Sequence, residues 1–88
     1  TCKEGVDRNK VVQYVENHGV QTRMLFAGNL IKHPCFDQMR ATGKGYRVAG
    51  SLENTDRIMT DTFWIGVYPG MTDAMLDAMA DAIKEALE

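Results

Sequence analysis

The segment TFWIGVYPGMT, residues 62–72, constrains the fold of this chain more than any other part of it. Aromatic and β-branched residues favour a pleated surface, so residues 63–68 predict a strand. Pro69 and Gly70 then end that strand with a turn, and Thr72 supplies a hydroxyl that can cap a helix. The fold must therefore place a strand and a helix in immediate succession.

The helix that follows Thr72 has the clearest period in the chain. Apolar residues recur at spacings of three and four, and charged residues occupy the other side. The apolar positions are Met75, Leu76, Met79, Ala80, Ile83 and Leu87. The polar side carries Asp73, Asp77, Asp81, Lys84 and Glu85, which we interpret as solvated charge rather than as catalytic carboxylates.

Weaker signals predict three further elements upstream. Asp7 precedes a helical pattern over residues 8–18, which Gly19 can end in a left-handed conformation. Residues 20–26 alternate between two faces and predict a strand. Asn54 can cap another helix, which leads into the strand at 63–68.

Residues 27–50 have no period and contain several glycines, so they predict a long irregular loop. Thr1, Cys2 and Lys3 look like the end of a strand, and the chain does not begin with Met, so we expect an excised piece of a larger protein. The predicted fold class is α+β, a single domain over residues 1–88 with a small, mainly antiparallel sheet and helices on one face.

The composition is that of a soluble globular domain. Of the 88 residues 44% are hydrophobic, and the net charge is only -2. No lysine and arginine run is present, so nucleic acid is not expected as a partner. No apolar run approaches the roughly 20 residues of a membrane span, so we expect no membrane partner and a cytoplasmic location.

Metal and phosphate chemistry find little support in the pattern. Cys2 and Cys35 are expected to be free thiols, and together with His18 and His33 they match no zinc spacing, so no metal site is predicted. The glycines of GKGYRVAG, residues 43–50, lack the spacing of a phosphate-binding loop, and we interpret this segment as a flexible loop.

Arg23 is the strongest candidate for a binding residue. A guanidinium in mid-strand needs an anionic partner, which can be a substrate group or an acidic side chain of the same fold. Phe26, Gly28 and Asn29 follow where the strand enters the loop, and offer an aromatic wall, a close backbone approach and an amide. Core packing of Phe26 and turn formation by Asn29 are the simpler alternatives, and Trp64 is interpreted as a core or interface residue.

Three stretches of the chain resemble one enzyme family. They are TRMLFAGNL at 22–30, NTDRIM at 54–59 and TFWIGVYPGMT at 62–72, with DRNKVVQYVENHG before them. Together they resemble the C-terminal small domain of the sugar-nucleotide 3-dehydrases. These enzymes belong to the DegT/DnrJ/EryC1/StrS group of fold type I, vitamin B6-dependent enzymes, and the resemblance covers nearly the whole chain.

The resemblance implies a parent enzyme that removes the 3-hydroxyl group of a nucleotide-linked 4-keto-6-deoxyhexose in O-antigen and lipopolysaccharide biosynthesis. Pyridoxamine phosphate and a two-iron two-sulfur cluster would be cofactors of the parent enzyme. The resemblance implies that this chain binds neither cofactor and contributes no catalytic residue. The implied partners are an N-terminal large domain of the same chain, the nucleotide sugar, a second copy in a homodimer and an electron-donating reductase. Arg23, Phe26, Gly28 and Asn29 of TRMLFAGNL would face the substrate cleft.

Two alternatives stay open from the sequence. One is the C-terminal domain of a pyridoxal phosphate-dependent nucleotide-sugar aminotransferase, which would need a cofactor-binding lysine in the large domain. The other is an independent ligand- or protein-binding module. The residues encoded upstream of Thr1 would distinguish these hypotheses.

Overall fold

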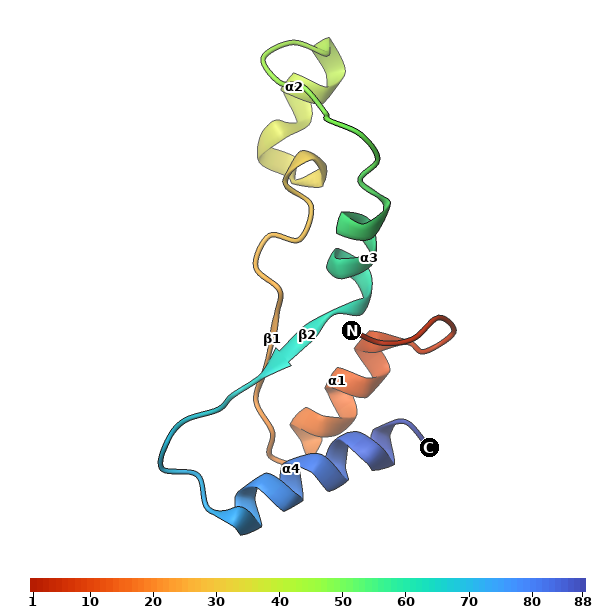
Figure 1. Cartoon of the computed structure of the whole chain (residues 1–88). Helices are drawn as coiled ribbons and strands as arrows, with labels where there is room; N and C mark the ends of the chain where they lie inside the picture. The colour runs from red at the N-terminus through yellow and green to blue at the C-terminus, as the bar shows by residue number, and fades with distance from the viewer.

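The computed structural model describes all 88 residues and shows an elongated molecule (Figure 1). The α-helices are α1 (Arg8–Asn17), α2 (Asp37–Thr42), α3 (Glu53–Asp61) and α4 (Asp73–Ala86). The strands are β1 (Thr22–Met24) and β2 (Phe63–Ile65), and two 3-10 helices, η1 (Leu30–Lys32) and η2 (Pro34–Phe36), precede α2. The predicted α+β class with a small antiparallel sheet is confirmed.

The sheet consists of β1 and β2 alone, with Arg23 directly opposite Trp64 at its centre. Both strands are shorter than the predicted ranges, 20–26 and 63–68. Phe26 explains where β1 stops, because its φ of 45° lies in the left-handed region and turns the chain out of the pleat. After β2 the pairing continues only as far as the Gly66 N–H, which donates to the Gln21 carbonyl oxygen at 3.3 Å, and the chain then runs irregularly to the start of α4.

Helix α1 and helix α4 pack against each other and hold most of the core (Figure 1). The buried side chains there are Val11, Val15 and Ala82. Asp7, which precedes the predicted helix, caps α1, because its carboxylate accepts hydrogen bonds from two backbone N–H groups of the first turn. Gly19, with a φ of 83°, follows the helix as predicted. The packed pair of α1 and α4 therefore contains most of the hydrophobic core of the molecule.

One polar contact ties the surfaces of α1 and α4 together. The Tyr14 hydroxyl donates a hydrogen bond to Oε2 of Glu85 at 2.9 Å, and the Tyr14 ring stacks on His18 at 4.2 Å between ring centroids. The hydrogen bond to Glu85 raises the pKa of Tyr14, with burial adding to the shift. The tyrosine therefore keeps its proton at neutral pH and serves as the donor.

Helix α4 begins as the sequence predicts. The Thr72 hydroxyl accepts a hydrogen bond from the Met75 N–H at 3.2 Å. The predicted apolar face is wider than the part that α1 covers, because Met75, Leu76 and Leu87 remain 42%, 41% and 56% exposed. A broad apolar face left uncovered in this way offers area for a further packing partner.

Helix α3 corrects two details of the sequence prediction. Asn54 lies inside the helix rather than at its cap, and the Ser51 hydroxyl accepts a hydrogen bond from the Glu53 N–H instead. The first three residues form no strand. They are attached to the end of α3, because the Cys2 N–H donates to the Asp61 carbonyl oxygen at 2.9 Å.

Residues 30–50, which we call the arm, extend away from the sheet at one end of the molecule (Figure 1). The prediction of an irregular loop is wrong for their first part, which holds η1, η2 and α2. The arm is fastened by Arg40, whose guanidinium donates to the carbonyl oxygens of Ile31 and His33 and pairs with Asp37. Because one polar side chain holds these short turns together, they need no regularly spaced apolar residues, and the sequence shows no hydrophobic period there.

The molecule exposes more surface than its size predicts. A folded monomer of 9.8 kDa should expose about 5,200 Å², whereas this chain exposes 6831 Å². The radius of gyration is 16.8 Å, compared with about 12 Å expected for a compact chain of this length. None of the helices has the length and apolar character required to cross a bilayer.

Candidate functional site

The three sequence motifs meet in one place in the structure. Pairing of β1 with β2 joins the first motif, 22–30, to the third, 62–72. The first motif is joined to the second, 54–59, by a hydrogen bond from Asn29 Nδ2 to Asp56 Oδ1 at 2.8 Å. The candidate site is the surface formed at this junction.

Arg23 points away from the α1–α4 core. Side chains alternate along a strand, and its neighbour Thr22 is buried, with its hydroxyl donating to Glu16 Oε1 at 2.5 Å. Arg23 itself is exposed, and its guanidinium forms no ion pair or hydrogen bond within the chain. Of the two alternatives left open by the sequence, an internal acidic partner for Arg23 is not found.

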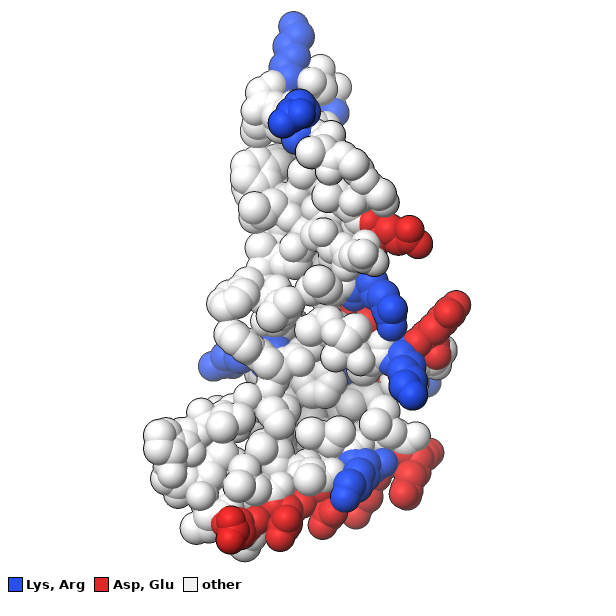
Figure 2. Space-filling view, in the orientation of Figure 1, with Lys and Arg blue, Asp and Glu red and all other residues white.

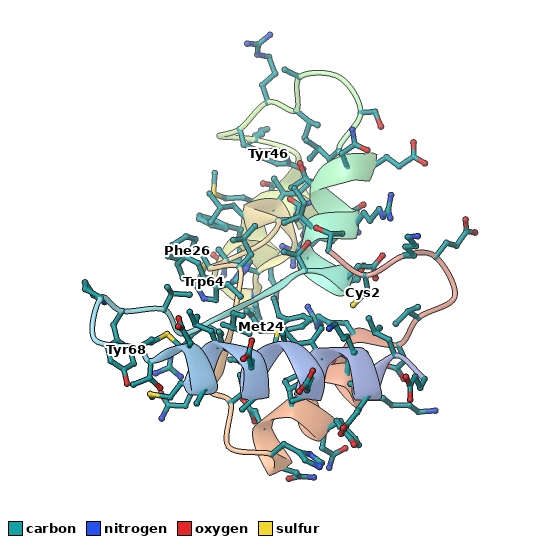
Figure 3. All side chains as sticks on the ribbon, turned by 60° about the horizontal axis from the view of Figure 1, so that its bottom comes forward. Cys2, Met24, Phe26, Tyr46, Trp64 and Tyr68 are labelled. Carbon is teal, nitrogen blue, oxygen red and sulfur yellow. The ribbon has the colours of Figure 1, made fainter.

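Phe26 and Trp64 form an exposed aromatic pair (Figure 3). Their rings meet edge to face, with centroids 4.9 Å apart and an angle of 70° between planes. Phe26 is 80% exposed, so the alternative that it packs in the core is wrong. Trp64 is 45% exposed and shares a face with Arg23, because directly opposite residues of an antiparallel pair point to the same side.

Trp64 is the site residue that sequence reasoning missed. The available signal was the alternation of side chains along a strand: Phe63 and Ile65 are half-buried, so Trp64 between them must face outward. The left-handed φ of Phe26 then brings its ring back to that same side, which strand alternation alone does not predict. Together Arg23, Trp64 and Phe26 form a continuous surface with one free cation and two exposed rings.

Gly28 lies under this surface in contact with α3. Its φ is 66°, and a Cβ atom placed there would lie 2.5 Å from Cγ and 2.6 Å from Cβ of Met59. Only glycine fits without displacing the helix side chain, so the close approach expected at this residue is made to α3. The structure therefore gives Gly28 a supporting position.

Asn29 is 2% exposed and uses both ends of its amide inside the chain. Its Nδ2 donates to Asp56, and its Oδ1 accepts from the Ile31 N–H, which caps η1. Lys32 Nζ also pairs with Asp56 Oδ1 at 2.8 Å, and these two donors, Lys32 first, hold the pKa of Asp56 below its usual range. Asn29 therefore fixes the backbone at the junction of two motifs, as the turn-forming alternative supposes.

The residues of this chain do not fit the iron–sulfur cluster implied by the family resemblance. An iron–sulfur cluster of this type is held by four side-chain ligands, usually cysteines, whereas the chain has only Cys2, which is buried, and Cys35, which is exposed. No group of three or more His, Cys, Asp and Glu side chains is arranged to bind a metal ion.

Comparison with known proteins places these motifs in a family. Residues 1–84 match the DegT/DnrJ/EryC1/StrS aminotransferase family. The chain is 51% identical over 74 residues to the lipopolysaccharide biosynthesis protein RfbH of Salmonella typhimurium, which is 82% of this chain and 16% of that protein. It is 45% identical over 69 residues to a dTDP-4-dehydro-2,6-dideoxy-D-glucose 3-dehydratase of Saccharopolyspora spinosa, 78% of this chain and 14% of that enzyme. The chain thus spans a small part of the length of each relative.

Proposed function

Because the chain belongs to the DegT/DnrJ/EryC1/StrS aminotransferase family, we propose that it is the C-terminal small domain of a sugar-nucleotide 3-dehydrase. The parent enzyme removes the 3-hydroxyl group of a nucleotide-linked 4-keto-6-deoxyhexose in lipopolysaccharide biosynthesis. The observation that carries this proposal is the similarity to a protein named as a 3-dehydratase over 78% of the chain. A nucleotide-sugar aminotransferase is the second candidate, because the family as a whole is named for that activity.

The contribution of this chain to the reaction is to shape the substrate cleft. The exposed rings of Phe26 and Trp64 offer apolar faces to the sugar, and the unpaired guanidinium of Arg23 offers a bidentate donor to an anionic or keto oxygen. Gly28 and Asn29 complete the substrate-binding segment by holding its backbone against α3. Chemistry at the sugar belongs to residues outside these 88.

An N-terminal large domain is the natural cover for the exposed surface. The chain exposes 6831 Å², well above the expectation for its mass, and the apolar face of α4 is only partly covered. In this proposal the large domain packs there and holds pyridoxamine phosphate and the two-iron two-sulfur cluster. The enzyme works as a cytoplasmic homodimer with an electron-donating reductase, and the 88-residue chain alone binds no pyridoxamine phosphate and is inactive.

The test is a product assay with the longer enzyme that contains this chain. It is supplied with pyridoxamine phosphate, a reducing system and a dTDP-linked 4-keto-6-deoxyhexose, and the product is identified by mass spectrometry and NMR. The proposal expects a sugar that has lost its 3-hydroxyl group. A 4-amino sugar formed with glutamate and pyridoxal phosphate would instead establish the aminotransferase.

The aromatic pair gives a second test in the same enzyme. Phe26→Ala or Trp64→Ala should lower kcat/KM roughly five- to twelvefold, which corresponds to about 1 to 1.5 kcal/mol, the upper part of the usual range for an aromatic contact. Tyr68→Ala is the matched control, since Tyr68 is 52% exposed but outside the pair. Equal losses for all three variants would mean that Phe26 and Trp64 have no special role in substrate binding.

A further inference from the structure

Positive charge is concentrated in the arm. Residues 30–50 contain four basic residues, Lys32, Arg40, Lys44 and Arg47, and a single acidic one, Asp37, although the chain as a whole has a net charge of -2. Figure 2 shows Lys and Arg atoms at the end of the arm, and Asp and Glu atoms along α4 at the opposite end. The arm is therefore the positive pole of an otherwise acidic protein.

Two of the four cations are committed to the fold, and two are free. Lys32 pairs with Asp56, and Arg40 pairs with Asp37 and donates to backbone carbonyl oxygens. Lys44 and Arg47 are exposed and form no ion pair. These two free cations stand on either side of Tyr46 in the sequence.

Tyr46 lies at the edge of an apolar cavity of about 130 Å³. The cavity is lined by Leu30, Ile31, Phe36, Met39, Arg40 and Tyr46. Gly45 brings the backbone against Met39, since a Cβ atom at Gly45 would lie 3.0 Å from the Met39 methyl group. The Tyr46 side chain is thereby held at the cavity while remaining 39% exposed (Figure 3).

We propose that the arm binds the nucleoside diphosphate part of a nucleotide sugar, with Lys44 and Arg47 on the diphosphate and Tyr46 against the base. Two unpaired cations match the two negative charges of a diphosphate diester, and arginine can contact a phosphate through two parallel N–H groups. An exposed tyrosine beside an apolar cavity can stack on any of the nucleic-acid bases, because every base has a π face. This inference rests on the proposed function, and it assigns the nucleotide to a segment whose sequence shows no phosphate-binding motif.

Direct binding of dTDP to the longer enzyme tests the site without requiring turnover. Titration calorimetry should show that Lys44→Gln/Arg47→Gln weakens dTDP about tenfold or more, and that Lys44→Glu/Arg47→Glu weakens it further. Lys84→Gln is the matched control, because Lys84 is an exposed lysine on α4 and should leave the affinity unchanged. Raising the salt concentration should weaken dTDP binding to the parent enzyme more than to the glutamine variant.

The base contact has its own readout. Tyr46→Ala should weaken dTDP but leave the affinity for inorganic pyrophosphate unchanged, whereas the two charge variants should weaken both. Unchanged dTDP affinity in both charge variants would overturn the proposal, as would loss of affinity for an oligothymidylate strand with dTDP unaffected. Because binding is measured without catalysis, an enzyme that binds dTDP through the arm but forms no deoxygenated sugar would count against the proposed reaction and not against this site.

Discussion

The contact between Gly28 and Met59 makes a sharp prediction about what holds the site together. Replacing Gly28 by Ala adds a Cβ atom 2.5 Å from Cγ and 3.0 Å from Cα of Met59, at a residue whose φ is 66°. The left-handed conformation costs a residue with a Cβ about 1–2 kcal/mol, and forcing a methyl group into a packed contact costs about 1–3 kcal/mol. We therefore expect Gly28→Ala to lower the free energy of unfolding by about 2–5 kcal/mol.

A matched control separates the two contributions. Gly50 has a φ of 73°, but nothing lies within 4 Å of a Cβ atom placed there. Gly50→Ala should therefore show only the backbone cost of about 1–2 kcal/mol. Urea unfolding of the 88-residue chain can be followed by the fluorescence of Trp64, its single tryptophan.

Three outcomes bear on the reasoning. A Gly28→Ala loss at least about 1 kcal/mol larger than that of Gly50→Ala supports a steric contact with α3. Truncating the neighbour, in Gly28→Ala/Met59→Ala, should recover part of the loss relative to Met59→Ala alone, because the clashing Cγ is gone. Equal losses for the two glycine variants would show that the first and second motifs do not pack as the structure has them.

The remaining predictions concern charge. Arg23→Ala should change the free energy of unfolding of the 88-residue chain by less than about 1 kcal/mol, because the side chain is exposed and unpaired. In the longer enzyme the same change should weaken substrate binding or turnover by about 1.5–3 kcal/mol, and Arg23→Lys should recover only part of that loss. A large loss of stability with normal kinetics would contradict this prediction. The carboxylate of Asp56 has a lowered pKa in the folded chain, so its stabilising contribution is present above the ordinary carboxyl pKa of about 4 and is lost as the pH falls through the lower, folded value. Asp56→Asn should therefore flatten the acid side of the stability–pH curve measured by urea unfolding, and an unchanged acid slope would assign that slope to other carboxyl groups.

The elements that the sequence predicts well are those whose signals are local. Helix α4 has an apolar period and the Thr72 cap within a short stretch, and α1 has the Asp7 cap and Gly19 at its two ends. No distant contact has to be known to recognise either helix in the sequence. Helix α1 ends one residue before its predicted end at His18, and α4 begins at the predicted Thr72 cap. The packing of these two helices supplies most of the core.

The features that the sequence does not predict depend on contacts between distant residues. Arg40 holds the arm by bonds to backbone carbonyl oxygens, which leave no mark in the hydrophobic pattern. Asn54 has good capping chemistry and predicts a helix that starts at Thr55, yet α3 starts two residues earlier, at Glu53. Strand parity places Trp64 opposite to Phe63 and Ile65, but its position beside Arg23 depends on the register between the two strands, which local sequence does not specify.

The four candidate residues of TRMLFAGNL divide into two that face outward and two that hold them there. Phe26 has a left-handed φ, which costs about 1–3 kcal/mol for a residue other than glycine, and its ring is 80% exposed, so little burial offsets that cost. The conformation is imposed from both sides: its N–H donates to the Met24 carbonyl oxygen at 2.8 Å, and the Gly28 N–H donates to that of Leu25 at 3.0 Å. Asn29, joined to Asp56, then anchors the segment to α3. The strained and exposed ring is thus kept against Trp64 by its neighbours, an arrangement that favours a role in contacting a ligand over a role in folding.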